Sequence, residues 1–245
     1  MQAARWLATA LFVAAVPVFL VLSNVRVATM EPRVYEYGFN RYGVAEVTGI
    51  ERPELNRAAV DIVRYFGDSR TLLTTRVEVG GQKQPLFTSR EALHMQDVKT
   101  LFRRAFFLHE VTFGYIAIYI TAVFLWARER PLRRLGSQLI AAGSATAGLL
   151  AFAALASLVS FDALFYGFHL VSFANDLWQL DPARDRLIQM FPRDFWFTVT
   201  IGVGIATVMQ GLLLVLAGYA LRAWFGRPSL ALPRSTMDLG GTERP

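Results

Sequence analysis

The run QLIAAGSATAGLLAFAALASLVSF, at residues 138–161, decides the fold class because it carries no charged residue. A helix needs about 20 apolar residues to cross roughly 30 Å of hydrocarbon, so this run predicts a membrane span. Its small residues, among them Gly143, Ala145 and Gly148, allow a neighbouring helix to approach closely.

Three further apolar runs predict membrane spans, at residues 1–25, 106–126 and 195–224. The composition agrees, since 54% of the residues are hydrophobic and the mean hydropathy is +0.36. The first run lacks a small-residue cleavage site and continues directly into Arg26. We therefore expect it to be a retained anchor and not a signal peptide.

The basic residues indicate how the chain is oriented. The net charge is +6, and the arginines gather beside the apolar runs, which favours membrane topology over a nucleic-acid partner. The predicted loop at 127–137 contains four arginines and only one acidic residue. The positive-inside rule then predicts that this loop, the N-terminus and the tail at 225–245 are cytoplasmic, whereas 26–105 and 162–194 lie outside.

Local patterns predict structure in the two outer segments. Apolar residues at helical spacing predict a helix over 53–65, ended by Gly67. A β-branched stretch at 72–79, the pair Gly80-Gly81 and a return at 84–87 predict a β-hairpin. Thr88 and Glu91 match a capping box that opens a helix leading into the second span.

We therefore expect a mainly α membrane protein with four transmembrane helices. Its extracytoplasmic α+β segment, at 26–105, combines helices with a hairpin. Amphipathic helices are expected at 162–194, one of them within 181–192, and the tail beyond Gly226 is expected to be disordered.

The chain has three histidines, His94, His109 and His169, and no cysteine. His94 lies on an apolar helical stripe with Val98 and Leu101. At helical spacing His169 shares a face with four residues, and a carboxylate there would fix the tautomer of the imidazole and raise its basicity. These four are Asp162, Ser172, Phe173 and Asp176.

A single histidine on an apolar face is more often structural than catalytic, but two on one side of a membrane make a catalytic pair a serious alternative. His109, at the outer end of the second span, is assigned no role.

Several chemistries lack their motifs. Without cysteine there is no disulfide, thiolate metal site or cysteine nucleophile. Neither HExxH nor GxSxG occurs, so a metal site is a weak alternative, no cofactor is expected, and a serine-hydrolase elbow is missing. A transporter is disfavoured because no span carries an ionisable residue near its centre.

Several blocks in order resemble the lipoprotein intramolecular transacylases, a family of four-span bacterial membrane proteins. The most specific are LFTSREALHMQDVK at 86–99 and, further on, FD at 161–162, FH at 168–169 and NDLW at 175–178. The other blocks are YEYGF at 35–39, VAEVTGI at 44–50, DRLI at 185–188 and FP at 191–192.

The resemblance implies an enzyme of the bacterial cell membrane whose active site faces outside. It would move the sn-2 acyl chain of a diacylglyceryl-modified lipoprotein to the α-amino group of its N-terminal cysteine, giving the lyso-form. The expected partners are such lipoproteins and the phospholipid bilayer. The alternative is a non-catalytic membrane protein that binds a lipid or a partner at the outer leaflet.

The family's histidine pair falls on His94 and His169. Ester aminolysis within one substrate needs no enzyme nucleophile, only a base and a group that protonates the leaving oxygen or steadies the oxyanion. Which histidine plays which part is left open. We expect Asp97 or Asp176 to orient an imidazole, and Tyr166 or Asn175 to donate a hydrogen bond.

Overall fold

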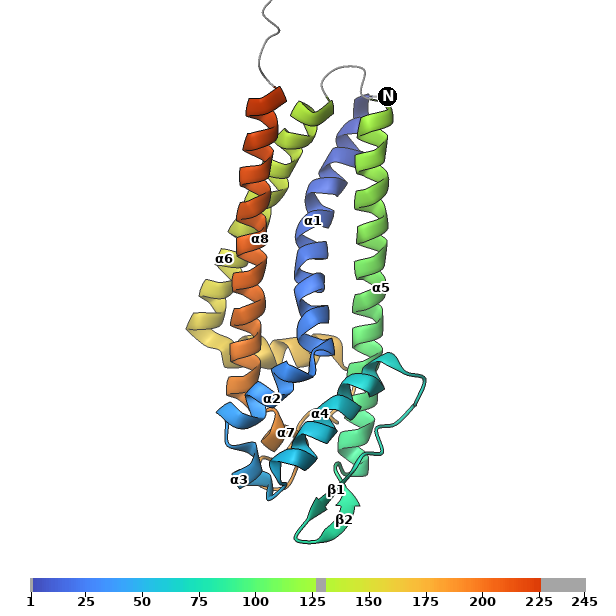
Figure 1. The fold of residues 1–245 in the computed structure, drawn as a ribbon, viewed down its shortest axis with the longest axis vertical. Coiled ribbons are helices and arrows are strands. Elements are labelled where there is room, and N and C mark those ends of the chain that lie inside the picture. The colour runs from blue at the N-terminus through green and yellow to red at the C-terminus, as the bar shows by residue number, and fades with distance from the viewer. Residues whose placement is uncertain (1, 127–130, 226–245) are drawn as a thin grey trace, which may run out of the picture.

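Four long helices run side by side and carry a smaller polar end (Figure 1). The computed structural model describes residues 2–126 and 131–225. The long helices are α1 (Gln2–Met30), α5 (Ser89–Trp126), α6 (Pro131–Ser172) and α8 (Arg193–Phe225). Residues 127–130 of the predicted cytoplasmic loop lie outside the described residues. The tail from Gly226, for which disorder is predicted, lies outside them too.

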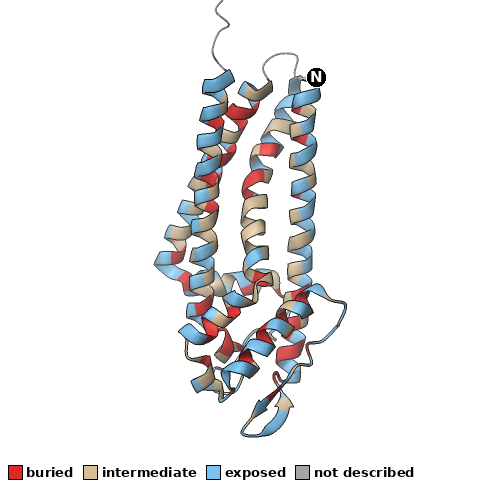
Figure 2. Cartoon of the chain, viewed as in Figure 1, coloured by how far each residue is buried: buried red, intermediate tan, exposed pale blue. Residues whose placement is uncertain are grey.

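Each long helix is apolar and long enough to cross a membrane, which confirms the four predicted spans. The helices extend beyond the apolar runs because they continue into the polar end. The faces of the bundle are largely exposed, whereas buried residues concentrate at the polar end (Figure 2). Exposed leucine and phenylalanine on four such helices are what a lipid-facing surface requires.

Helices α6 and α8 pack closely through glycine. A methyl group added at Gly143 would collide with the backbone oxygen of Gly211, and one at Gly136 would lie 2.7 Å from the backbone oxygen of Gly218. Gly148, by contrast, faces open space. The predicted close approach is therefore confirmed at Gly143 and depends on the lack of a side chain there.

Polar side chains tie α1 to the other spans. Asn24 donates from Nδ2 to Thr207 Oγ1 at 3.0 Å and to Gln210 Oε1 at 2.8 Å on α8. On α5, Tyr115 donates to the backbone oxygen of Ala8 at 2.7 Å. Pairing these groups removes the cost of placing them in hydrocarbon.

The polar cap consists of six short elements together with the first turns of α5. They are α2 (Pro32–Arg41), α3 (Val44–Thr48), α4 (Arg52–Gly67), β1 (Arg76–Val79), β2 (Gln82–Pro85) and α7 (Arg186–Met190). The predicted helix over 53–65 is confirmed by α4, whose apolar residues Leu55, Ala59 and Ile62 are buried in the main core with Met190 of α7. The cap is thus a small folded unit built from two distant parts of the chain.

The predicted hairpin is confirmed, with a shorter first strand and a second strand that begins two residues earlier than expected. Val79 pairs with Gln82, so Gly80 and Gly81 form a two-residue turn, with φ of 59° and 77° that favours glycine. Residues 72–75 and 86–87 fall outside the strands, although the backbone nitrogen of Leu86 still donates to the oxygen of Thr75 at 2.8 Å, and Leu73 and Leu86 are buried in the core of the cap.

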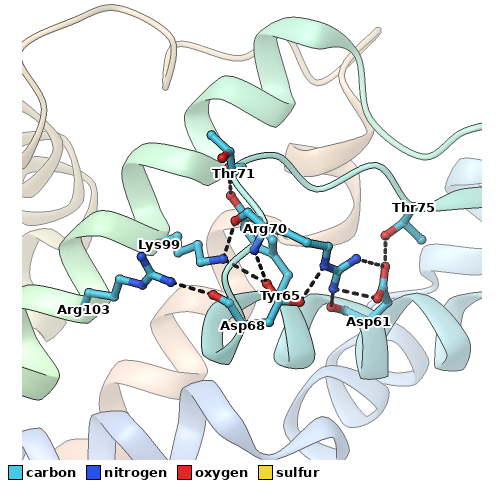
Figure 3. Close-up of polar contacts among 8 residues, drawn as sticks. All are labelled: Asp61, Tyr65, Asp68, Arg70, Thr71, Thr75, Lys99 and Arg103. Carbon is cyan, nitrogen blue, oxygen red and sulfur yellow. Dashed lines mark hydrogen bonds and ion pairs between the residues drawn. The ribbon is translucent and has the colours of Figure 1, made fainter.

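An ionic network joins α4 to α5 (Figure 3). Arg70 donates to Asp68 at 2.6 Å and to Asp61 at 2.9 Å. Lys99 of α5 is 3% exposed and donates to Asp68 Oδ1 at 3.1 Å while its ammonium lies 4.0 Å from the centre of the Tyr65 ring. The ammonium also donates to the backbone oxygen of Arg70 at 2.6 Å, and these contacts offset the cost of burying its charge.

The network also sets the acidity of Asp68. Desolvation by itself would raise the pKa of this carboxyl group, but hydrogen bonds from Arg70 and Lys99 outweigh it and lower the pKa to about 2. The carboxylate therefore stays ionised well below neutral pH.

Helix α6 bends at Ser160, whose φ of −156° and ψ of 71° are not helical. Beyond the bend its last turns lie across the cap end of the bundle (Figure 1). The amphipathic helices expected at 162–194 are present up to Ser172 and again in α7, but residues 173–185 form turns. The predicted helical face shared by His169 and Asp176 is therefore wrong, because the helix ends between them.

Candidate active site

Two histidines from different helices meet where the cap joins the bundle. The ring centroids of His94, near the start of α5, and His169, in the last turn of α6, lie 6.3 Å apart, with 29° between the ring planes. Their exposed fractions are 6% and 8%. The structure thus brings together the pair that the sequence singled out.

Aromatic rings surround His169. The centroid of its ring is 4.4 Å from that of Phe165, 5.0 Å from Trp178 and 5.6 Å from Phe173. Phe173 also contacts His94 edge-on, at 5.1 Å. These rings exclude water from the pair, which strengthens any electrostatic interaction within it.

A backbone carbonyl fixes the tautomer of His169. Its Nδ1 lies 2.7 Å from the oxygen of Phe165, which can only accept a hydrogen bond. Nδ1 therefore carries the proton, and Nε2 of the neutral ring carries the lone pair. Among the described residues, neither Asp97 nor Asp176, the carboxylates expected to orient an imidazole, makes a hydrogen bond to a histidine ring. Asp162, which lies on the same helical face as His169, pairs with Arg193 at 2.6 Å.

His94 is held differently. Its Nδ1 is fully buried and has no hydrogen-bond partner within the part of the chain that the structure describes. Only Nε2 can therefore reach a bound molecule.

Burial keeps both imidazoles neutral. Both rings lie outside the apolar runs at 106–126 and 138–161. Desolvation first, and then the proximity of His169, lower the pKa of His94 to about 4, although the negative charge of Asp97 acts to raise it. Desolvation also lowers the pKa of His169, against the opposing effect of the hydrogen bond to Phe165.

The four residues expected to support the histidines, Asp97, Tyr166, Asn175 and Asp176, make different contacts. Asp97 accepts a hydrogen bond from Asn175 Nδ2 at 2.9 Å, which ties the segment after α6 to the helix that carries His94. Tyr166 is exposed and packs edge-on against Trp178 at 5.4 Å. Asp176 accepts a hydrogen bond from Gln179 Nε2 at 3.1 Å.

Two residues that the sequence reasoning did not assign to the site hold it together. Arg90 donates to the backbone oxygens of Asp176 and Gln179 at 2.8 and 2.9 Å. Glu91 was predicted only as part of a capping box, which Thr88 confirms, and it also accepts from the backbone nitrogen of Leu187 at 2.6 Å. No sequence signal identifies these partners, because backbone groups look alike in every residue.

The remaining candidates lie elsewhere. His109 lies between α1 and α5, where Nε2 is 2.9 Å from Ser23 Oγ and the ring stacks on Phe19 at 4.9 Å. In residues 2–126 and 131–225, no group of three or more histidine, aspartate or glutamate side chains is arranged to hold a metal ion. The pair formed by His94 and His169 is therefore the candidate site.

Fold and site together define an integral membrane protein with four spans and a shielded histidine pair under a polar cap. The model of the family described as lipoprotein intramolecular transacylase Lit matches residues 10–196. This is most of the chain, and the protein belongs to that family.

Solved structures agree with this fold. The membrane integral lipoprotein intramolecular transacylase from Bacillus cereus superposes with a TM-score of 0.67 at 15% identity, over 92% of this chain and 97% of that one. A second structure of that protein, carrying a point mutation, gives 0.70 at 14% identity, over 91% and 94%. At such identities the likeness shows the shared fold.

A curated relative is an uncharacterised protein from Aquifex aeolicus, 29% identical over 132 residues. The match covers 54% of this chain and 56% of that protein. The chain therefore spans little more than half the length of that relative.

Proposed function

We propose that this protein transfers the sn-2 acyl chain of a diacylglyceryl-modified bacterial lipoprotein to the α-amino group of its N-terminal cysteine, leaving the lyso-form. The observation that carries the proposal is the water-shielded pair of neutral imidazoles, His94 and His169, in a chain of the transacylase family. Both the attacking amine and the ester belong to the substrate, so two proton-handling groups are sufficient.

The reaction balances without water. The free amine attacks the ester carbonyl, the new C–N bond forms, and the amine loses one proton. The tetrahedral intermediate collapses as the C–O bond to glycerol breaks, and the glycerol oxygen takes up one proton. The enzyme accepts a proton in the first step and returns it in the second.

The tautomers of the two histidines favour one assignment of their catalytic roles. We assign the base to His169, because the hydrogen bond from Nδ1 to Phe165 leaves the lone pair on Nε2. The same nitrogen returns the proton to the leaving oxygen. We assign to His94 the stabilisation of the oxyanion by an Nε2–H group, because its buried Nδ1 has no acceptor to which it could donate.

A lipid can reach this site from the bilayer. The last turns of α6 lie across the cap end of the bundle (Figure 1), where Phe168 and Leu164 are exposed and Val171 is 91% exposed. An apolar helix at this depth lies where the ester groups of a lipid are found. The diacylglyceryl group can thus remain in the leaflet while its ester reaches the two rings.

We further propose that the cap faces outside and both termini face the cytoplasm. Arg5 at the start of α1, Arg133 and Arg134 at the start of α6, and Arg222 at the end of α8 all belong to the helix ends opposite the cap (Figure 1). Basic residues flanking spans are retained on the cytoplasmic side. Mature lipoproteins that are anchored in the outer leaflet of this membrane would then meet the histidine pair.

The test is mass spectrometry of a lipoprotein N-terminus from a host that lacks other N-acylating enzymes. The wild-type protein should convert the diacylglyceryl form to the lyso-form, with the acyl chain on nitrogen. His94→Ala and His169→Ala should each reduce conversion by about 100-fold or more, the usual contribution of a positioned acid or base.

His109→Gln is the matched control, since it removes a third histidine from the same helix as His94, and conversion should persist. If both active-site variants still gave the lyso-form, the two-histidine mechanism would be wrong. If the wild type gave none, the substrate assignment would fail, and a non-catalytic lipid-binding role would be favoured.

A further inference from the structure

A second feature lies on the far side of α5 from the histidine pair. It is a recess of about 270 Å³ between the end of α1, the end of α4 and the middle of α5. The residues that matter here are Arg26 and Met30 of α1, Phe66 of α4, and Arg103, Phe107 and Glu110 of α5.

The recess is separate from the candidate active site. Arg103 follows His94 by nine residues (103 − 94) on the same helix. Nine residues of α-helix turn through about 900°, which is half a turn beyond two full turns, and rise by about 13.5 Å. A ligand in the recess would therefore not touch the two imidazoles.

Two guanidinium groups border the recess, against one carboxylate. Arg26 Nη1 pairs with Glu110 Oε1 at 3.2 Å, and both side chains are substantially exposed. Arg103 uses Nη2 to donate to the backbone oxygen of Asp68 at 2.6 Å. Since each guanidinium has five N–H donors, both keep donors for an anion, and the recess has a net positive charge.

The recess also lies where the apolar run of α5 meets the polar cap, a position that suits a lipid headgroup. Its arginines come from the last turns of α1 and from the residues just before the apolar run at 106–126, where the polar cap begins. The guanidinium of Arg26 lies over the Phe106 ring at 5.0 Å, and Phe107 is 68% exposed. Positive charge above exposed apolar surface matches a phosphate above its acyl chains.

We propose that this recess binds the phosphate of a phospholipid, held by Arg26 and Arg103, with an acyl chain lying along Phe107 and the lipid-facing side of α5. Arg103 also contacts the backbone of Asp68, so the phosphate would be linked to the network that joins α4 to α5. A lipid held here fixes the depth of α5 and thereby the depth of His94 in the leaflet.

The experiment measures lipid retention by native mass spectrometry of the full chain in a neutral detergent, with three probes. Dioleoyl phosphatidylglycerol should be retained. Dioleoylglycerol, which has the same chains and no phosphate, should be retained about tenfold less, and inorganic phosphate should compete only weakly. Arg26→Gln and Arg103→Gln should each weaken retention of phosphatidylglycerol by about tenfold, the scale of one charge-assisted hydrogen bond.

Arg76→Gln is the matched control, because it removes the same charge from the hairpin, away from the recess, and should leave retention unchanged. Glu110→Gln frees Arg26 from its partner and should increase retention, a gain that a misfolded protein would not produce. The proposal is overturned if dioleoylglycerol is retained equally well, if the three arginine variants behave alike, or if inorganic phosphate displaces the lipid at equal concentration. It is likewise overturned if Glu110→Gln weakens retention.

Discussion

Glu91 offers the sharpest test of how the cap is held on the bundle. Its side chain is fully buried, with an exposed fraction of 0%. One carboxylate oxygen accepts from the backbone nitrogen and hydroxyl of Thr88, each at 2.7 Å, and the other accepts from the backbone nitrogen of Leu187 at 2.6 Å. A single carboxylate therefore caps α5 and anchors α7.

The isosteric change Glu91→Gln replaces one acceptor by an NH2 donor. If the remaining oxygen keeps the cap at Thr88, the new NH2 group faces the N–H of Leu187, and that buried donor loses its partner. An unpaired buried donor costs about 1–3 kcal/mol. With a value of about 2 kcal/mol, the population in which α7 is detached rises by roughly 30-fold, since each 1.4 kcal/mol is a factor of ten.

Hydrogen–deuterium exchange followed by mass spectrometry measures this opening directly. Amides of residues 186–191 should exchange about 30-fold faster in Glu91→Gln, whereas those of the four spans should not change. Glu46→Gln is the control, since this exposed glutamate of α3 makes no side-chain hydrogen bond among the described residues. Unchanged protection of residues 186–191 in Glu91→Gln would refute the anchoring argument.

Three further predictions concern the network, the helix packing and the orientation. Asp68 has a pKa of about 2, below the ~3.9 of an unfolded aspartate. The stabilisation from this carboxylate is therefore complete above about pH 4 and is lost as the pH falls through about 2. Asp68→Asn should lower the thermal stability of the protein at pH 7 and flatten the decline of that stability between pH 4 and pH 2. Gly143→Leu should lower the midpoint of thermal unfolding in detergent, since overpacking costs about 1–3 kcal/mol or more, whereas Gly148→Leu, where the added side chain meets open space, should not. Because the chain has no cysteine, Lys83→Cys should react with a membrane-impermeant maleimide on intact cells and Gln2→Cys only after lysis, and the reverse pattern would invert the proposed orientation.

The local predictions succeeded where neighbouring residues alone decide the structure. The turn at Gly80 and Gly81 needs two positive φ angles, which glycine supplies. The burial of Leu55 and Ile62 follows from helical spacing, and the capping box at Thr88 from two side chains three residues apart. Each of these structural features depends only on residues that are close together in the sequence.

The predictions that were wrong concerned where an element begins or ends and which group contacts a given side chain. The helical face of His169 was extended to Asp176, but α6 ends at Ser172. The partner expected for the imidazole was a carboxylate, and the structure uses the carbonyl of Phe165. The residue types do not show that α6 ends at this point, because the segment beyond it is held by tertiary contacts such as the hydrogen bond from Arg90 to Asp176.

The sequence by itself determined the four spans, because hydrocarbon imposes its requirement on every residue of an apolar run, beginning with 138–161. It also identified His94 and His169 as the residues to examine. Only the tertiary structure decided that their rings lie 6.3 Å apart, that aromatic side chains shield them, and that His169 keeps its lone pair on Nε2. The physical reason is that hydrophobicity is a property of each residue, whereas proximity between distant residues arises from packing. Here that packing depends on the bend at Ser160 and on the cap, which holds the segment beyond α6 against α5.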